Sequence, residues 1–263
     1  MKRSIHHLFL AAAILAVTAC AKAEDAFYYD GESANKENPS AETEPGDAAT
    51  AQQSFSFIAT LHRTDDGDYY LQVDAGLRVY PANFGDLCHI EPDCPCRIVG
   101  EVIVFDRLMG DLGYYGLLDW FDFIEKGPFV PATLEYEDTP DGETPPEGNA
   151  PNGTDGVDVL ADWMTTLEDG FLTLHIQTWW GFEPRRHEFR LVTGTNPTDP
   201  YELRLLHFAN RDPKSFQADA LVCYDLMPVL PLPDDPENTT VTLKWTNDAG
   251  QTQSRAFPYV GRY

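Results

Sequence analysis

Short stretches in which apolar and polar residues alternate, separated by turn residues, predict a protein built almost entirely from β-strands. The clearest stretch is 241–246, where Val241, Leu243 and Trp245 alternate with polar neighbours. That period of two is typical of a strand with one buried face. Long stretches with helical spacing are scarce. The pattern therefore predicts an all-β fold class.

The first group of strands predicts a five-stranded OB-like β-barrel domain over residues 54–126. Its expected strands cover 55–63, 69–74, 77–80, 97–105 and 114–124. The sequence Asp65-Asp66-Gly67-Asp68 predicts a hairpin turn, because Asp-Gly tolerates the positive φ that such turns need. Gly100 within the fourth strand predicts a bend or bulge. Five strands in this order, with a glycine bend in a long one, are typical of a small OB-like barrel.

The second group of strands predicts a β-sandwich domain over residues 127–263. Its expected strands cover 129–136, 157–163, 171–180, 187–193, 201–208, 220–226, 239–246 and 252–259. Short strands separated by glycine and proline turns at this spacing favour a sandwich. Residues 138–156 are rich in proline, glycine and acidic residues, and we expect a mobile acidic loop there.

The N-terminal residues predict export and lipidation. Lys2 and Arg3 precede an apolar run that is too short to span a bilayer, and small residues follow at 18 and 19. This pattern predicts a signal peptide over 1–19. Cys20 directly after it looks like a bacterial lipobox, so Cys20 is the expected lipidation site. Residues 20–53 are acidic with little to bury, which predicts a disordered tether.

Length and charge narrow the possible partners. The chain has 263 residues, which suits one large or two small domains, and a formal net charge of −25. Nucleic acid needs clustered Lys and Arg, so we expect no nucleic-acid partner. Broad adhesion to anionic lipid is equally disfavoured, which leaves the lipid anchor as the expected contact with the membrane. These features predict a lipid-anchored protein of the bacterial outer membrane, and its exposure at the cell surface remains open.

Four cysteines besides Cys20 are disulfide candidates, namely Cys88, Cys94, Cys96 and Cys223. An exported chain permits disulfides, and a bond from Cys88 to Cys94 or Cys96 would close a short loop. The spacing does not fit a zinc site, so we expect no metal. Cys-Pro-Cys also lacks the two-residue gap of a Cys-x-x-Cys redox site. Cys223 is either a buried apolar residue or the partner of the third loop cysteine.

No catalytic signature is present. The sequence contains no His-Glu-x-x-His, no Gly-x-Ser-x-Gly and no phosphate-binding loop, so we expect neither an enzyme nor a cofactor. The ligand-binding candidates are Trp179, His175 and Gln177, which share one face of the expected strand 171–180. An exposed Trp179 would anchor a protein or stack on a sugar, unless another strand or the barrel domain covers it.

The chain resembles the NigD-like lipoproteins of anaerobic Gram-negative bacteria. The matching residues are the lipobox, Ala59–Asp74, Val79–Asn83, Tyr114–Tyr115 and Asn152–Asp155 leading into Val157–Val159. The resemblance implies an N-terminal OB-type domain and a C-terminal β-sandwich, in agreement with the strand pattern. It also implies a role in bacteriocin immunity, and it offers no catalytic residues to carry over.

These features together predict a cell-envelope lipoprotein without catalytic activity that recognises a protein or a glycan. A bacteriocin immunity lipoprotein and an enzyme acting on polysaccharide are the alternatives. Neither the ligand nor the oligomeric state follows from the sequence.

Replacing the expected lipidation site tests the anchor. Cys20→Ala should move the protein from the membrane fraction to the soluble fraction, because the acyl chains would be absent. Fractionation followed by immunoblotting measures the change. A variant that still sediments with membranes would disprove the lipobox interpretation.

Overall fold

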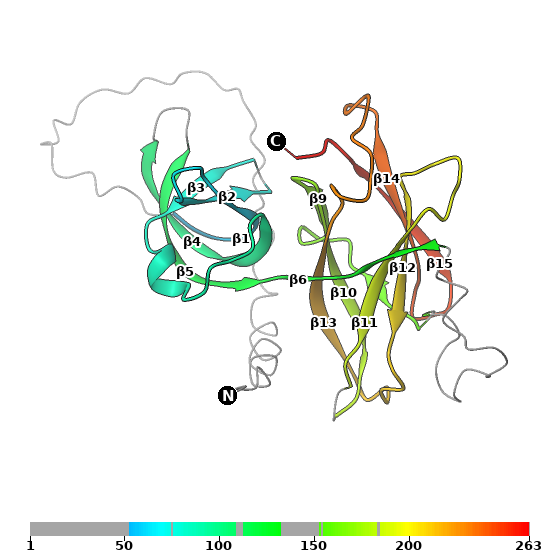
Figure 1. Ribbon diagram of the computed structural model, residues 1–263. Coiled ribbons are helices and arrows are strands. Elements are labelled where there is room, and N and C mark those ends of the chain that lie inside the picture. Colours follow the sequence, from blue (N-terminus) through cyan, green and yellow to red (C-terminus); the bar gives the residue numbers. More distant parts are fainter. Residues whose placement is uncertain are drawn as a thin grey trace, which may run out of the picture. The chain divides into compact units, whose positions relative to one another are not determined.

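The computed structural model describes residues 53–74, 76–108, 113–132, 153, 155–182 and 185–262. It consists of strands that form a closed barrel and two further sheets (Figure 1). The all-β fold class is therefore confirmed. The expected signal peptide, Cys20 and nearly all of the expected tether lie outside the described residues, as does almost all of the loop 138–156.

The barrel has the five strands that the sequence predicts. They are β1 (Gln53–Arg63), β2 (Tyr69–Val73), β3 (Arg78–Pro81), β4 (Cys96–Leu108) and β5 (Tyr114–Phe123). The barrel closes in the order β1-β2-β3-β5-β4, and only β3 and β5 pair in parallel. Side chains of alternating residues, such as Leu71 and Val73, fill its core. The OB-like barrel is confirmed.

The short helix α2 (Phe84–Leu87) was not predicted. Its buried Phe84 packs in the barrel core. Asn83 before it holds β5, because its side chain donates to Leu118 O (2.8 Å) and accepts from Leu118 N (2.9 Å). A four-residue helix has almost no periodicity to detect. Within the described range, no helix is long and apolar enough to cross a bilayer.

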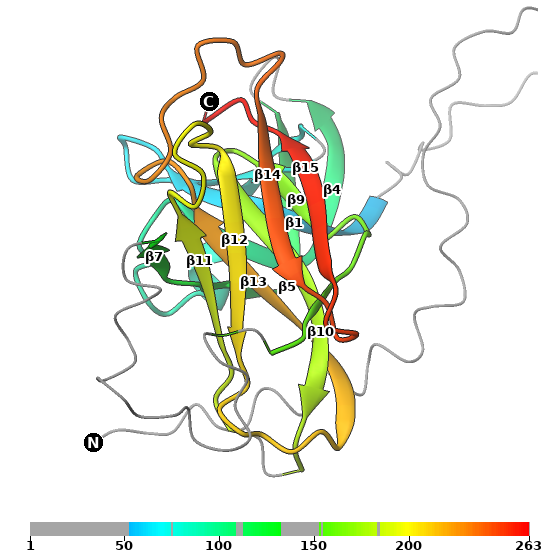
Figure 2. The same ribbon diagram turned by 90° about the vertical axis from the view of Figure 1, so that its right-hand side faces the viewer.

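The second domain is a β-sandwich of two sheets. Its strands are β6 (Glu125–Lys126), β7 (Phe129–Pro131), β8 (Asp158–Val159), β9 (Thr166–Glu168), β10 (Phe171–Trp180), β11 (Glu188–Thr193), β12 (Glu202–Phe208), β13 (Phe216–Asp225), β14 (Thr240–Thr246) and β15 (Thr252–Pro258). One sheet has the order β6-β13-β10-β8, with β9 also paired to β10, and the other has the order β15-β14-β12-β11-β7. Figure 2 shows β15, β14, β12 and β11 side by side in front of β10 and β13.

The sandwich core follows the predicted alternation. Leu172, Leu174 and Ile176 of β10 are fully buried, as are Val241 and Leu243 of β14. Both sets lie in one apolar cluster between the sheets. Burial of one face of each sheet is the main force that holds a sandwich together.

Several strands differ from the prediction, and β6 was not predicted at all. The expected strand 157–163 is reduced to β8, because Asp162 turns the chain by accepting a hydrogen bond from Met164 N (3.0 Å). The turn leads into β9, which was not predicted. The strand expected at 220–226 begins four residues earlier, at Phe216, which pairs with Trp180 of β10.

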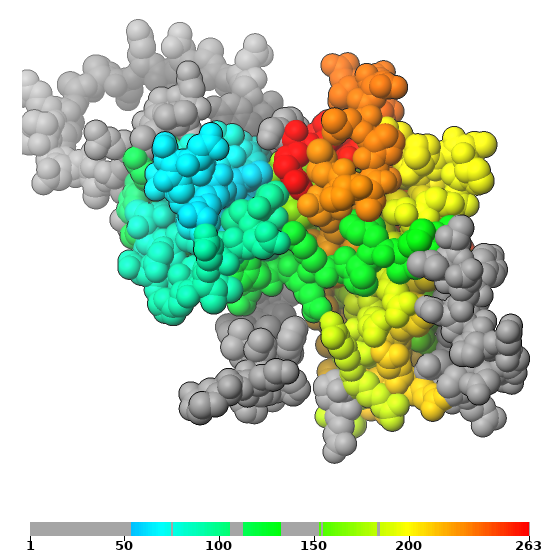
Figure 3. Space-filling view, viewed as in Figure 1, coloured from blue at the N-terminus to red at the C-terminus, as the bar shows by residue number. Residues whose placement is uncertain are grey.

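The sandwich begins slightly earlier than residue 127. Glu125 and Lys126 already pair in parallel with Val222 and Cys223 of β13. The segment that contains β6 and β7 runs from the barrel across the sandwich (Figure 3, green). The barrel domain therefore ends with β5 and the buried Ile124.

A fully buried arginine joins the two domains. The Arg97 guanidinium of β4 binds both carboxylate oxygens of Asp74 (2.6 and 2.5 Å) and donates to Thr60 Oγ1 (3.1 Å). Its Nε donates to Thr173 Oγ1 of β10 in the sandwich (3.0 Å). Burial raises the pKa of Asp74, while the hydrogen bonds from Arg97 oppose that rise. Arg97 thus ties three barrel segments to one sandwich strand.

Two further contacts support the same junction. Ile58, Ile124 and Cys223 form a small apolar cluster that combines barrel and sandwich residues. His62 Nε2 lies 2.5 Å from Asp169 Oδ2 of the sandwich. The junction is therefore both apolar and ionic.

Breaking the buried pair should strongly destabilise the chain. Asp74→Asn leaves the Arg97 charge buried without a counter-ion, and we expect a loss of roughly 3–5 kcal/mol in the free energy of unfolding. Urea unfolding measures it. As a matched control, Arg63→Met removes the exposed ion pair with Glu91 and should leave the free energy of unfolding nearly unchanged, because solvent screens exposed ion pairs. Equal losses in the two variants would refute the structural role of Arg97.

Candidate functional site

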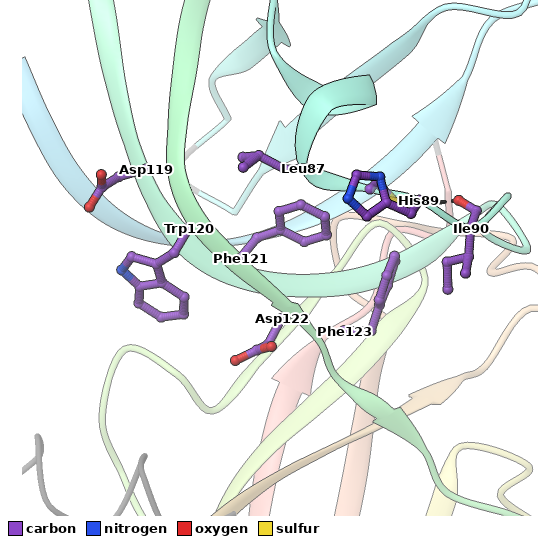
Figure 4. Close-up of a pocket in the computed structure, with 9 residues that line it drawn as sticks. Leu87, His89, Ile90, Asp119, Trp120, Phe121, Asp122 and Phe123 are labelled. Carbon is purple, nitrogen blue, oxygen red and sulfur yellow. Dashed lines mark hydrogen bonds between the residues drawn. The ribbon is translucent and has the colours of Figure 1, made fainter. Parts of the chain in front are cut away.

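The described part of the barrel has a hollow of about 370 Å³ between strand β5 and the loop after α2. We call it the aromatic hollow. Its lining residues are Leu87, Cys88, His89, Ile90, Asp119, Trp120, Phe121, Asp122 and Phe123. Figure 4 shows Phe121 and Phe123 leaving the strand toward Leu87, His89 and Ile90, whereas Trp120 leaves it on the other side. The volume lies at the lower end of the range for ligand pockets.

A β-bulge places these aromatic residues. The pairing of β4 with β5 shifts between Glu101 and Val102, whose partners are Trp120 and Leu118, so Asp119 is an extra residue. The bulge changes which side chains of β5 face outward, and it leaves Trp120 44% exposed after the buried Leu118. The bend or bulge predicted at Gly100 is present next to this position. A Cβ on Gly100 would lie 2.4 Å from Trp120 O, so only glycine fits this close approach.

The apolar wall of the hollow is fixed to the barrel core. Phe121 stacks on the buried Phe84 with ring centroids 5.4 Å apart, and Phe123 meets Phe121 edge to face at 5.5 Å. Leu87, Ile90 and Phe123 are 41%, 66% and 40% exposed. The core therefore holds Phe121 and Phe123 in place, and the apolar wall remains open to solvent.

The charges in the hollow are negative. Asp119 and Asp122 are its charged residues apart from any charge on His89, and none of its nine lining residues is Lys or Arg. Partial burial raises the pKa of Asp122. The hollow thus combines an apolar wall with carboxylates, a surface suited to binding an apolar group that carries positive charge nearby.

The ligand-binding candidates from the sequence lie together on β10, but their polar groups are already bonded within the chain. Trp179 Nε1 donates to Asp248 (2.6 Å), and Gln177 Nε2 donates to Asp219 (2.8 Å). His175 Nδ1 contacts Asp162 (2.6 Å) and is largely buried. Trp179 itself is half-buried. These three residues keep few groups available for a ligand, and their role in binding stays a prediction.

A buried row of acid–base groups in the sandwich was not found from the sequence, because its members are far apart along the chain. His207 Nδ1 lies 3.0 Å from Gly156 O, so this nitrogen must donate. His207 Nε2 then accepts from His187 Nδ1 (3.0 Å), whose Nε2 lies 3.2 Å from Asp212 Oδ2. Burial lowers the pKa of His187, while its contact with Asp212 opposes that fall.

This row of hydrogen-bonded side chains resembles the catalytic acid–base–nucleophile triad of a hydrolase only in part. Its outer end is a backbone carbonyl where a hydrolase has a hydroxyl or thiol nucleophile. His207 is 1% exposed, and the rings of Trp180 and Phe189 stack on His187 and His207. The row therefore joins the loops and strands around it and does not reach a substrate.

All four described cysteines are free thiols. Cys88, Cys94 and Cys96 pack on or in the barrel core, and Cys223 lies at the junction between the domains. The disulfides expected from the sequence stay a prediction. In the described segments, no group of three or more His, Cys, Asp or Glu residues is arranged to hold a metal ion.

Comparison with known proteins identifies the sandwich. Residues 142–259 match the family described as NigD-like C-terminal beta sandwich domain. A structure from Parabacteroides distasonis, provisionally named as toxin-related, has a TM-score of 0.57 at 21% identity and covers 79% of this chain and 94% of its own. A protein of unknown function from Bacteroides vulgatus has a TM-score of 0.55 at 16% identity, with 79% and 91% covered.

A third structure, provisionally named as a lipoprotein from Bacteroides fragilis, has a TM-score of 0.52 at 11% identity, with 80% of this chain and 99% of its own covered. No curated protein matches the chain in sequence. At these identities the solved structures show a shared fold.

The buried His207 should make stability depend on pH. Burial lowers its pKa from about 6.5 to about 4, so the folded chain keeps it neutral while the unfolded chain binds a proton. The stability that the neutral His207 contributes to the fold is present above the unfolded pKa of about 6.5. As the pH falls to 4, about 3 kcal/mol of the free energy of unfolding is lost.

His207→Asn keeps a donor for Gly156 O but does not titrate, so its stability should fall less between pH 6.5 and 4. Urea unfolding at several pH values measures the difference. The exposed His89→Asn is the control and should retain the wild-type slope. An unchanged slope in His207→Asn would contradict the assignment.

Proposed function

Because residues 142–259 match the NigD-like C-terminal β-sandwich family, we propose that the chain is a non-catalytic cell-envelope lipoprotein that binds a protein partner through the aromatic hollow. The observation that supports this proposal is the exposed apolar wall of Leu87, Ile90 and Phe123. Phe121 connects Phe123 to the barrel core. A preformed apolar surface of this kind loses little conformational entropy on binding.

The composition of the wall favours a protein over a glycan. Leu87 and Ile90 are aliphatic and offer neither a ring face nor a hydrogen-bonding group to a sugar. Such side chains are suited to the apolar, fully buried core of a protein interface. A glycan is the second candidate, supported by the exposed ring of Trp120 between Asp119 and Asp122.

The charge of the chain indicates what the partner carries. The net charge is −25, and the hollow itself contains carboxylates and no Lys or Arg. An acidic surface speeds encounter with a basic partner and repels acidic ones. The proposed partner therefore presents an apolar side chain flanked by Lys or Arg.

Immunity is a special case of this proposal. A basic, apolar toxin would be a suitable partner, and contact with the hollow would sequester it at the envelope. The family resemblance and the toxin-related name of one structural neighbour are in keeping with it. The lipid on Cys20 would hold the protein at the outer membrane, where such a toxin arrives.

Site-specific crosslinking tests the proposal. A photoreactive phenylalanine analogue in place of Ile90, introduced in cells that produce the protein natively, should form a protein–protein adduct. The same analogue in place of Trp163, which is 57% exposed on the sandwich, is the matched control. Mass spectrometry identifies the adduct. Identical adducts at both positions, or none at position 90, would reject the hollow as a protein-binding site.

The identified partner then allows a quantitative prediction. Phe123→Ala should weaken binding roughly 30-fold, since a central apolar anchor contributes about 2 kcal/mol. Trp163→Ala should leave the Kd unchanged. Isothermal titration calorimetry measures both. A polysaccharide that competes for wild type and not for Phe123→Ala would instead support the glycan alternative.

A further inference from the structure

We propose that Cys94 and Cys96 form a dithiol–disulfide couple that exchanges with disulfide bonds of other molecules, with Cys94 as the attacking thiol. The site lies on the segment that leads into β4 and does not depend on the function proposed for the aromatic hollow. Its substrate class is a small-molecule or protein disulfide.

The fold gives the two thiols different surroundings. Cys96 opens strand β4, pairs in register with Leu61 of β1 and is 9% exposed. Cys94 precedes the strand and is half-exposed, although it packs against the same core cluster. A partly accessible thiol beside a buried one is the arrangement in which the first attacks and the second resolves.

The two side chains lie close enough to perturb each other. The hydrogen bond from Cys96 is the largest cause of a lowered pKa at Cys94, and the same contact, together with burial, raises the pKa of Cys96. Both side chains pack at the same barrel-core cluster, although only one residue separates them and the two-residue gap of a Cys-x-x-Cys site is absent.

Two positively charged side chains influence these two cysteines, although the chain as a whole is strongly acidic. Lys126 Nζ donates to the carbonyl oxygen of Pro95, the residue between the two cysteines (3.4 Å). Lys126 and Arg63 both lower the pKa of Cys94, whereas Asp93 and partial burial oppose them. A thiolate next to positive charge is the form that attacks disulfides.

The other described cysteines have different surroundings. Burial raises the pKa of Cys223 to about 12, and its thiol contacts Ile124 O at 3.6 Å. The Cys88 thiol donates to Ile90 O (3.1 Å) in the loop after α2. Cys88 is partly exposed like Cys94, but it lacks a neighbouring resolving cysteine at one-residue spacing, and its thiol is engaged by Ile90 O.

The chemistry balances as a two-electron exchange. The Cys94 thiolate attacks one sulfur of a disulfide R–S–S–R′, forms a mixed disulfide with R–S and releases R′–S⁻. The Cys96 thiol loses its proton to solvent and attacks Cys94 Sγ, which releases R–S⁻ and leaves the Cys94–Cys96 disulfide. The substrate is reduced to two thiols, and these take up the two protons that the cysteines gave up.

Thiol counting tests the couple. The full chain carrying Cys20→Ala has four cysteines, and after reduction and unfolding in denaturant all four should react with an alkylating reagent. Equilibration with oxidised glutathione should leave two. Cys88→Ala and Cys223→Ala should still lose two thiols, whereas Cys94→Ser and Cys96→Ser should not form the intramolecular bond. Mass spectrometry of the intact protein measures the number of alkylated thiols in each variant.

A trapping variant separates exchange from a structural disulfide. Cys96→Ser should accumulate a mixed disulfide with glutathione on Cys94, because the resolving thiol is absent. Lys126→Met should shift the pH of half-maximal reaction upward. The proposal is overturned if the Cys20→Ala protein keeps four reactive thiols after equilibration with oxidised glutathione, if Cys88→Ala prevents the bond, or if Cys96→Ser gains no glutathionyl group.

Discussion

The buried guanidinium of Arg97 is the constraint on which the arrangement of both domains depends. A charge with no access to water must have all its partners in place. Arg97 of β4 takes them from β1 and from Asp74, directly after β2, in the barrel and from β10 in the sandwich. Displacement of β10 relative to the barrel would leave its Nε without a partner. The apolar cluster of Ile58, Ile124 and Cys223 excludes water beside it, so each contact strengthens the other.

The barrel uses this rigidity to display an apolar surface at another place. Gly100 allows β5 to approach β4 closely, the extra residue Asp119 changes the direction of the side chains that follow, and Phe121 attaches the exposed Phe123 to the core. Exposed apolar side chains are costly unless they bind something, and here they are held in position by buried ones. The sandwich contributes no comparable wall on β10, because the polar groups of its Trp179 face are bonded to neighbouring carboxylates.

The thiols show why spacing alone is a poor guide to reactivity. Cys-Pro-Cys lacks the gap of the common redox motif, which argued against redox chemistry at the level of sequence. The folded chain supplies what the spacing does not, since it buries Cys96, leaves Cys94 accessible and brings Lys126 from the next segment to the carbonyl between them. The row of His207, His187 and Asp212 was also missed from the sequence. Its members come from different strands and loops, so their spacing along the chain gives no sign of it.

The sequence by itself determined the all-β class, the barrel followed by a sandwich, and most strand positions, because each depends on local alternation and turn residues that can be read within about ten positions. It also predicted an irregularity near Gly100, whereas the structure puts the register shift between Glu101 and Val102 and the extra residue on β5. Only the tertiary structure decided which side chains meet. Partners distant in sequence, or local backbone geometry, decide the remaining features. These features are the short elements α2, β6 and β9, the Arg97 junction, the aromatic hollow and the surroundings of Cys94 and Cys96. Periodicity carries no information about either, because it reports which face of a segment is buried and not what buries it.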